Sequence, residues 1–293
     1  MTHVSASRDH DLALLFPGQG VGDESARDLV ASERPDLLEL ANELVGEDPF
    51  ARIADGTRFA QPVIYCASLA GLERLGRPDA GLLAGHSLGE IPALAAAGVV
   101  DDADGLRIVV ERGRLMDAAA TAGEAGGMLA VGGDRDAAER LAERHGLTLA
   151  NENSPKQFVL SGPEKLLDVA AAEAKDSGLR AKRLAVRGAF HSPAMETVVA
   201  SFENFLAGIE LHEPRVPVLS CVTAAPFGAD VRSLLAAALT RPVRWVDVLR
   251  RLREDGGTRF VDVGPGKVLA GLVKRTLDGV SVETNQSPEP QGA

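Results

Sequence analysis

Short apolar runs alternate along the chain with longer segments in which apolar residues recur at helical spacing. The short runs predict buried strands, and the helical spacing predicts amphipathic helices that pack against them. The predicted strands are 12–16, 82–84, 216–221 and 259–263. The predicted helices are 23–50, 62–75 with Pro62 at its start, 91–99, 104–121, 195–209, 231–240, 245–254 and one that ends near 276. Strands that alternate with helices predict an α/β domain.

The stretch 126–190 follows a different order. Strands are predicted at 128–131, 147–151, 157–161 and 181–186, with helices at 137–145 and 164–177. This β-α-β-β-α-β order is the ferredoxin-like pattern, for which about 65 residues is a suitable length. We therefore predict a main domain formed by 11–125 and 191–280, with a ferredoxin-like insert at 126–190. The polar ends, 1–10 and 283–293, are expected to be disordered.

Composition and charge narrow the class of protein. None of the apolar runs reaches the roughly 20 residues of a membrane span, and the first residues lack the regions of a signal peptide. Cys66 and Cys221 suggest neither a disulfide framework nor a metal site, so we expect a cytoplasmic protein. The net charge of −11 argues against nucleic-acid binding. Residues 181–275 nevertheless hold 14 basic and 9 acidic residues, a local charge of +5 that could receive an acidic partner.

One motif suggests nucleophilic catalysis. Gly85-His86-Ser87-Leu88-Gly89 fits the Gly-x-Ser-x-Gly nucleophile elbow, between a predicted strand and a predicted helix. The small residues allow the tight turn that exposes the Ser87 hydroxyl, and the first free amides of the helix face whatever that hydroxyl attacks. The same pattern also fits a glycine-rich turn with an incidental serine.

A serine nucleophile needs a base, usually a histidine. The six histidines are His3, His10, His86, His145, His191 and His212. The first two lie in the polar end, His86 is expected to point away from the elbow, and His145 and His212 fit a helix end and a surface loop. His191 remains, where the insert rejoins the main domain and a cleft is expected. We find no acid in a motif between Ser87 and His191, so a dyad oriented by a backbone carbonyl is possible.

Two further features need an explanation. The first predicted strand ends in Pro17-Gly18-Gln19-Gly20, a tight loop at the end of a strand where ligands bind in α/β sheets; it could also be a plain turn. Arg112 lies in the helix after the elbow helix. It is either a functional cation or a surface arginine paired with Glu111 or Asp117.

Together these residues resemble a known family. Six motifs occur in the family's order: 15–20 (Leu-Phe-Pro-Gly-Gln-Gly), 85–90 (Gly-His-Ser-Leu-Gly-Glu), Arg112-Gly113, Asn153-Ser154-Pro155, 188–191 (Gly-Ala-Phe-His) and 263–267 (Val-Gly-Pro-Gly-Lys). The chain resembles malonyl-CoA:acyl-carrier-protein transacylases and the acyltransferase domains of polyketide synthases over about residues 11–280. That resemblance implies an α/β-hydrolase-like main domain with the ferredoxin-like insert.

The resemblance also implies a ping-pong reaction. Ser87, activated by His191, would take malonyl from CoA as an ester, and the phosphopantetheine thiol of an acyl carrier protein would then take it from Ser87. The backbone amides of Gln19 and Leu88 would form the oxyanion hole. The CoA thioester and the phosphopantetheine are substrates, and neither a bound cofactor nor a metal is implied.

The same resemblance assigns the substrate-binding residues. Arg112, 25 residues after Ser87, would hold the free malonyl carboxylate with its planar fork. Phe190 matches the bulky residue that malonyl-selecting polyketide acyltransferases carry before the histidine. Asn153 matches a motif asparagine near the cleft, and Met116 is assigned to substrate binding with them. Where family members have a glutamine near the carbonyl that orients the histidine, this chain has Ala238.

For partners, we expect malonyl-CoA and an acidic carrier protein or carrier domain, with a monomeric enzyme that binds neither nucleic acid nor a membrane. The carrier-docking candidates are Lys182, Arg183, Arg187, Lys274 and Arg275.

Several biological roles fit this sequence. Fatty acid synthesis, polyketide synthesis and malonate decarboxylation all use this transfer chemistry. An acyl-carrier-protein hydrolase of the same fold is a further hypothesis, although such relatives tend to lose the arginine. A non-catalytic carrier-binding subunit is disfavoured by the intact serine, histidine and Gln19 loop.

Overall fold

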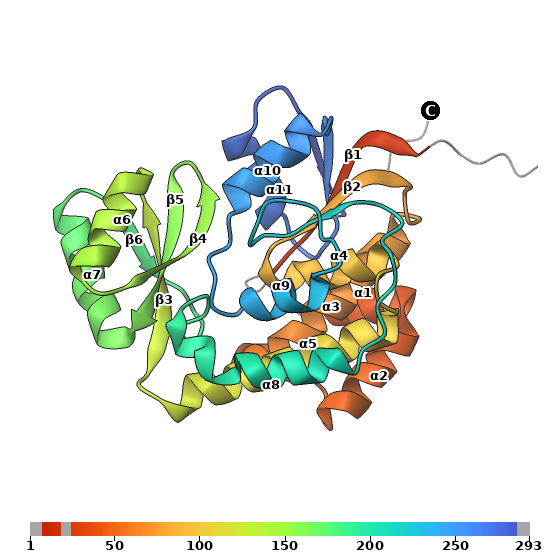
Figure 1. Ribbon diagram of the computed structural model, residues 1–293, viewed down its shortest axis with the longest axis horizontal. Helices are drawn as coiled ribbons and strands as arrows, with labels where there is room; N and C mark the ends of the chain where they lie inside the picture. Colours follow the sequence, from red (N-terminus) through yellow and green to blue (C-terminus); the bar gives the residue numbers. More distant parts are fainter. Residues whose placement is uncertain (1–7, 19–24, 286–293) are drawn as a thin grey trace, which may run out of the picture.

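Five parallel strands form the central sheet of the larger unit in the computed structural model, which describes residues 8–18 and 25–285 (Figure 1). The strand order is β7-β2-β1-β8-β9. The strands are β1 (Asp9–Phe16), β2 (Ala80–Gly85), β7 (Val218–Leu219), β8 (Arg259–Asp262) and β9 (Ser281–Thr284). Strand β2 is buried along its whole length, and β1 is buried from Leu12 to Phe16, which explains the apolar sequence of both stretches.

Successive side chains of β1 point to opposite faces of the sheet and join two separate cores. Leu12, Leu14 and Phe16 pack against the first group of helices. These are α1 (Ser25–Glu33), α2 (Pro35–Val45), α3 (Thr57–Arg74), α4 (Glu90–Ala96), α5 (Asp102–Ala122), α8 (Glu196–Ala207) and α9 (Val231–Ala237). Ala13 and Leu15 pack on the other face against α10 (Trp245–Glu254) and α11 (Val268–Thr276). The sheet is therefore covered on both faces (Figure 1).

A second, antiparallel sheet forms the smaller unit, with the order β4-β5-β3-β6. Its elements are β3 (Gly126–Gly132), α6 (Arg135–Arg144), β4 (Thr148–Ser154), β5 (Gln157–Pro163), α7 (Glu164–Asp176) and β6 (Arg180–Arg183). Helices α6 and α7 cover one face over a core that includes Leu129, Leu160 and Leu167. This β-α-β-β-α-β unit beside a parallel α/β sheet confirms the predicted fold class.

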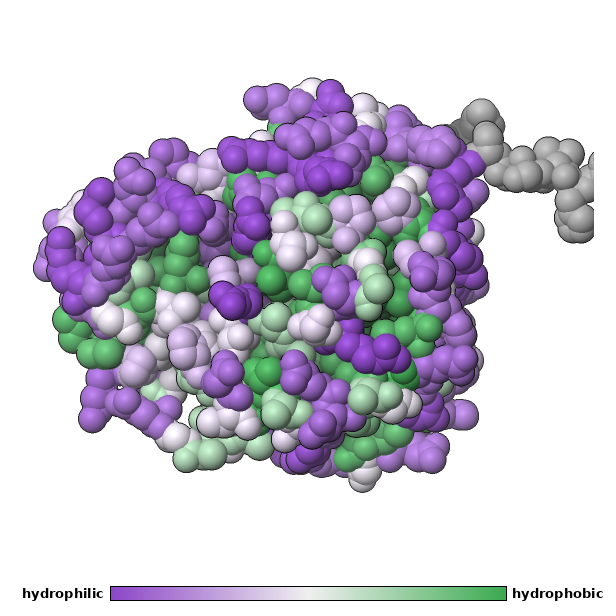
Figure 2. Space-filling model, in the orientation of Figure 1, coloured by the Kyte–Doolittle hydropathy of each residue, from purple (hydrophilic) through white to green (hydrophobic). Residues whose placement is uncertain are grey.

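The two units meet along β4. Asn151 forms a parallel bridge with Val243, and Val243 and Ala150 share a backbone hydrogen bond of 2.8 Å. The space-filling view shows hydrophilic residues over the upper part of the smaller unit, whereas weakly polar and apolar residues lie lower on it and toward the larger unit (Figure 2).

Several element boundaries differ from those predicted. The helix predicted at 23–50 is two helices, because the chain turns at Arg34 and Pro35 starts α2. Helix α3 begins at Thr57, so Pro62 lies inside it. The proline removes one helical hydrogen bond, but α3 is buried from Phe59 to Leu72 and its packing outweighs that loss.

The predicted disordered ends were partly wrong. Strand β1 begins at Asp9, and Glu283 and Thr284 belong to β9. Both segments gain backbone hydrogen bonds from a neighbouring strand, and side-chain polarity does not reveal such pairing. The rest of these ends, 1–7 and 286–293, lies outside the described residues.

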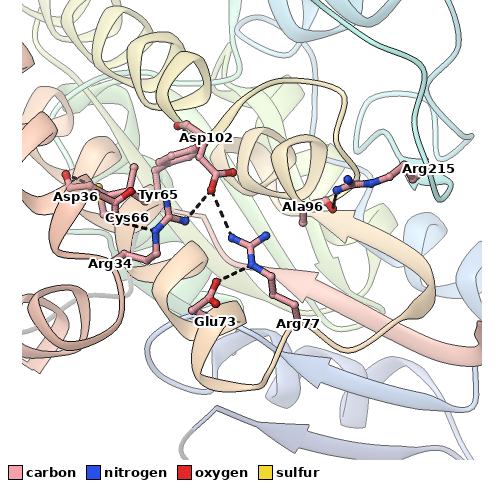
Figure 3. A network of polar contacts seen from close by, with 10 residues as sticks. Arg34, Asp36, Tyr65, Cys66, Glu73, Arg77, Ala96, Asp102 and Arg215 are labelled. Atoms are coloured by element: carbon pink, nitrogen blue, oxygen red, sulfur yellow. Dashed lines mark hydrogen bonds and ion pairs between the residues drawn. The ribbon is translucent and has the colours of Figure 1, made fainter. Parts of the chain in front are cut away.

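A polar network ties the start of α5 to the helices beside it (Figure 3). The Asp102 carboxylate accepts hydrogen bonds from Arg34 at 2.7 Å and from Arg77 at 3.4 Å. The Asp102 carbonyl accepts the Tyr65 hydroxyl at 2.8 Å. The network fixes the first turn of α5, the helix that contributes Arg112 to the site from its middle.

Candidate active site

Ser87 lies on a tight turn between β2 and α4. The turn is a short 3₁₀ helix, Ser87–Gly89, and Ser87 itself has a φ of +54°. A left-handed backbone at a residue other than glycine is strained and often found at functional sites. A Cβ atom on Gly85 would lie 1.9 Å from the Gly89 carbonyl carbon, and one on Gly89 would lie 2.0 Å from the Phe16 carbonyl oxygen. Both glycines are therefore required by close backbone contacts.

The Ser87 hydroxyl lies 2.8 Å from Nε2 of His191. On the other side of the ring, Nδ1 of His191 lies 3.1 Å from the Arg241 carbonyl oxygen. A carbonyl only accepts, so Nδ1 carries the proton and Nε2 is free to accept the Ser87 proton. Within the described residues the imidazole has no carboxylate partner, and the geometry is that of a dyad.

The orienting carbonyl lies in the region expected from the sequence. The sequence indicated the stretch around Ala238, and the hydrogen bond is accepted by the carbonyl of Arg241, three residues further on. Helix α9 ends at Ala237, and the three residues after Ala238 carry the chain on to the imidazole. The Ala238 backbone has only a weaker effect on the ring.

Burial keeps the His191 imidazole neutral. Removal from water, together with the nearby Arg112 charge and His86, lowers the pKa of His191 to about 3. We therefore expect acylation at saturating thioester to keep a constant rate as the pH falls from about 8 to 5, because the base stays unprotonated. Single-turnover rates across this range would measure it. A loss of rate centred near the ordinary histidine pKa would contradict this expectation.

Arg112 is not a surface arginine. Its side chain is 3% exposed, and burial lowers the pKa of its guanidinium to about 10. Nη1 donates to Gln61 Oε1 at 2.9 Å, and Nη2 donates to the Ser87 hydroxyl oxygen at 3.2 Å. None of the described carboxylates forms an ion pair with it. The guanidinium is thus a buried cation aimed at the nucleophile, without an anion in contact.

Gln61 was missed by the sequence analysis. Its amide nitrogen donates to Thr57 Oγ1 at 2.9 Å and contacts the Met116 sulfur at 3.3 Å, so its oxygen is fixed toward Arg112. The available signal was a polar residue within the apolar sequence of α3.

The pocket in front of Ser87 has one polar end and apolar walls. Gln61, Arg112 and His191 lie at the polar end, and Met116 and Phe190 contribute to the walls. His86 also faces this pocket, so it does not point away as predicted. Its Nε2 lies 2.8 Å from Asn153 Oδ1, which joins the elbow to β4 of the smaller unit. Asn153 therefore lines the pocket and also holds His86.

The predicted oxyanion donors can be placed only in part. Leu88 follows Ser87 in the 3₁₀ turn and lines the pocket, whereas Gln19 lies outside the described residues. Gly18 packs against the elbow, since a Cβ atom there would lie 2.5 Å from the His86 carbonyl oxygen. Pro17 in turn packs on Gly264, where a Cβ atom would meet Pro17 Cγ at 2.0 Å. The motifs at 15–20 and 263–267 thus pack in sequence behind the nucleophile elbow, the first against the elbow itself and the second against Pro17.

The five carrier-docking candidates form two groups. Lys182 and Arg183 lie on β6 with Arg187 after it, and Arg183 and Arg187 line a polar cavity with 53–57. Lys274 and Arg275 lie at the end of α11. The first turn of α11 borders a small apolar cavity whose lining includes Val268, His86 and Asn153. The last two also line the Ser87 pocket, and so do Leu184 and Val186, which lie between Arg183 and Arg187. Both groups of candidates therefore adjoin segments that reach the site.

Metal and membrane features were also sought in residues 8–18 and 25–285. No group of three histidine, cysteine, aspartate or glutamate side chains there could hold a metal ion. None of the helices described is long and apolar enough to cross a membrane.

Comparison with known proteins gives consistent matches. Residues 28–287 match the family model of the acyl transferase domain. The chain is 38% identical over 95% of its length to the polyketide biosynthesis protein ThaF of Burkholderia thailandensis, and spans 25% of that protein. A malonyl-CoA:acyl carrier protein transacylase from Xanthomonas oryzae has a TM-score of 0.88 at 35% identity, with 96% of each chain covered. A further match is the PlMCAT:AntF structure, which contains a type II polyketide synthase acyl-carrier protein in complex with its malonyl-transacylase. Its TM-score is 0.87 at 30% identity, and the match covers 94% of this chain and 96% of that chain.

Proposed function

The chain belongs to the acyl transferase domain family, and from this premise we propose that it transfers malonyl from malonyl-CoA to the phosphopantetheine thiol of an acyl carrier protein. The observation that supports malonyl as the acyl group is the buried Arg112, whose Nη2 lies 3.2 Å from Ser87 Oγ. The names of its structural relatives, malonyl transacylases with carrier-protein partners, agree with this proposal.

The first half-reaction loads Ser87. The hydroxyl gives its proton to Nε2 of His191 as Oγ attacks the thioester carbonyl carbon, and the carbonyl becomes an oxyanion. The carbonyl re-forms as the C–S bond breaks, and the departing CoA thiolate takes the proton from His191. A malonyl ester on Ser87 remains, and the imidazole is neutral again.

The second half-reaction reverses these steps with a different thiol. The carrier phosphopantetheine thiol gives its proton to His191, and its sulfur attacks the Ser87 ester. The C–O bond breaks, Oγ recovers the proton, and malonyl leaves on the carrier. The Leu88 amide, with Gln19 as the second donor, is proposed to stabilise the oxyanion in both halves.

Arg112 gives the reaction its substrate preference in this proposal. A malonyl carboxylate in a closed pocket needs a cation, because an unpaired buried charge is costly. Phe190, Met116 and Asn153 complete the pocket and limit its size. Pathway assignment to fatty acid or polyketide synthesis follows from which carrier protein the enzyme serves.

Incubation with malonyl-CoA, with and without an acyl carrier protein, tests the proposal. We expect a malonyl adduct on Ser87, detected by intact mass, that moves to the carrier when the carrier is added. An adduct that water removes as fast without the carrier would instead indicate an acyl-carrier-protein hydrolase.

We also propose that the acidic carrier docks on the α11 side. Lys267, Val268, Lys274 and Arg275 lie on the exposed side of this helix, while Leu269 and Leu272 face the core. Val268 is a half-exposed apolar residue between the cations. By contrast, Arg183 on β6 already lies near the carboxylates of Glu164 and Asp168, at 3.7 and 3.8 Å.

Charge reversal separates the two groups. The double variant Lys274→Glu and Arg275→Glu is expected to raise the KM for the carrier and weaken its salt dependence, because steering by opposite charge is lost. Loading from malonyl-CoA is the internal control and should be unchanged. The matched variant Lys182→Glu and Arg183→Glu should have a smaller effect on the carrier KM. The reverse ranking would place the carrier on β6.

A further inference from the structure

Glu90 is a buried carboxyl group that the mechanism does not use. It is the first residue of α4, directly after the elbow, and its side chain is 1% exposed. Its Oε1 accepts the backbone N–H of Cys221 at 2.6 Å, and the side chains of Ser220 and Cys221 also bond to it. The carboxyl group therefore joins the nucleophile turn to the segment that follows β7.

Glu90 and Arg112 both adjoin the nucleophile turn, since Glu90 lies three residues after Ser87 and Arg112 Nη2 donates to the Ser87 hydroxyl oxygen at 3.2 Å. They do not form a direct ion pair, since the described contacts of Arg112 are Gln61 and Ser87. The Arg112 charge nevertheless favours ionised Glu90, and the Glu90 charge favours protonated Arg112. Among the described residues, Glu90 is thus the carboxylate whose charge acts on the buried guanidinium without touching it.

The groups that act on Glu90 are few. Burial raises the pKa of Glu90 to about 7, and the positive charge of Arg112 opposes that rise. Cys221 is the other titratable neighbour, and burial raises its pKa well above the usual range, so it stays a thiol. His191, with its pKa lowered to about 3, does not titrate near neutral pH. Within the described residues, Glu90 is therefore the group of this site that can exchange a proton near neutrality.

A second carboxylate at Arg112 would change this balance. It would neutralise the guanidinium that favours ionised Glu90, and would add a negative charge of its own. Two carboxylates that share one cation in a buried site do not both ionise easily. We propose that Glu90 is a positioning residue that takes up a proton from solvent when Arg112 binds the malonyl carboxylate, an inference that rests on the proposed function.

The consequence is a pH-dependent affinity for the carboxylated substrate only. Above neutral pH, where free Glu90 is ionised, each malonyl group bound requires one proton from solution. Linkage then predicts that the dissociation constant of malonyl-CoA rises by up to about tenfold per pH unit. Acetyl-CoA carries no carboxylate, so its binding should not involve Glu90.

Calorimetry on the Ser87→Ala protein tests this without turnover. Malonyl-CoA and acetyl-CoA would be titrated in buffers of different ionisation enthalpy, at about pH 8, to count the protons taken up. We expect the protein to take up close to one more proton with malonyl-CoA than with acetyl-CoA. Both ligands carry the same CoA phosphates, so any protons that the phosphates bind cancel in this difference. The double variant Ser87→Ala and Glu90→Gln keeps an oxygen for the Cys221 amide, and should lose the extra proton and the pH dependence.

Asp262 supplies a matched control. It is equally buried, its pKa is also raised to about 7 by burial, and it accepts the Ala270 amide at 3.0 Å at the start of α11. In the Ser87→Ala background, Asp262→Asn should keep the extra proton. If Glu90→Gln fails to fold, infrared difference spectra of Ser87→Ala protein serve instead, with a protonated-carboxyl band appearing on addition of malonyl-CoA but not acetyl-CoA.

Two failures would be distinguishable. If Ser87→Ala and its Glu90→Gln double variant take up the same number of protons, or no carboxyl band appears, the Glu90 inference is wrong while the proposed function stands. If adding Arg112→Ala to Ser87→Ala leaves malonyl-CoA affinity unchanged, the carboxylate does not bind at Arg112. In that case the proposed selection of malonyl by Arg112 is wrong, and the Glu90 inference, which rests on it, is wrong as well.

Discussion

Replacing Ser87 with alanine is expected to abolish the malonyl adduct, because no other hydroxyl lies at hydrogen-bond distance from Nε2 of His191 among the described contacts. The turn itself should survive. Its close contacts are made by Gly85 and Gly89, and alanine tolerates the φ of +54° no worse than serine does. Intact mass after incubation with malonyl-CoA gives the result directly.

Ser161 provides the matched control for this variant. It is fully buried on β5 of the smaller unit, outside the pocket. Ser161→Ala should load malonyl like the wild type, and the thermal transitions of both variants should show that the fold is kept. A Ser87→Ala protein that still acquires malonyl would mean that another group is the nucleophile.

The parts of the site that could be predicted are those whose chemistry lies in adjacent residues. The elbow needs glycine on either side of Ser87, because a side chain at Gly85 or Gly89 would collide with nearby backbone. The requirement therefore appears in the sequence within two residues of the nucleophile. The smaller unit was equally readable, since its strands and helices follow each other in the β-α-β-β-α-β order that the sequence predicts. Short-range requirements of this kind leave a pattern in the sequence.

The parts that could not be predicted depend on residues distant in sequence. The carbonyl of Arg241 orients His191, and a carbonyl has no side-chain signature. Gln61 meets Arg112 only because α3 packs against α5. Strand β9 carries no strong apolar pattern and is defined by its pairing with β8. Glu90 belongs to a recognised motif, yet its burial beneath the site follows from the position of Cys221.

Arg112→Ala is expected to have the most informative effect on substrate choice. Hydrogen bonds to a charged group contribute about 1.5–3 kcal/mol, which corresponds to roughly 10- to 150-fold in rate or affinity. Loss of the guanidinium also leaves the malonyl carboxylate in a buried pocket without a cation, which adds to that cost. The kcat/KM for malonyl-CoA should therefore fall by at least this factor.

Loading of acetyl from acetyl-CoA should rise relative to loading of malonyl when Arg112 is replaced by alanine. In the wild type acetyl-CoA leaves a desolvated guanidinium without an anion, and removing Arg112 removes that penalty. Competitive loading from mixed malonyl-CoA and acetyl-CoA, read as the mass of the Ser87 ester, should shift toward acetyl. Arg112→Lys should restore malonyl only in part, because an ammonium is a point charge without the planar fork that reaches Gln61 and Ser87 together.

A variant of Arg114, two residues further along α5, is the control that separates the effect of position from the effect of charge. The Arg114 side chain is 59% exposed and pairs with Glu111, so Arg114→Ala removes the same charge from the same helix without reaching the pocket. We expect wild-type loading ratios for this variant. Should Arg112→Ala behave like Arg114→Ala, the buried guanidinium would serve the packing of α5 against α3 and not the selection of a carboxylated acyl group. Because Nη1 is held by Gln61 while Nη2 reaches Ser87, the geometry favours selection, and the two arginines are expected to differ.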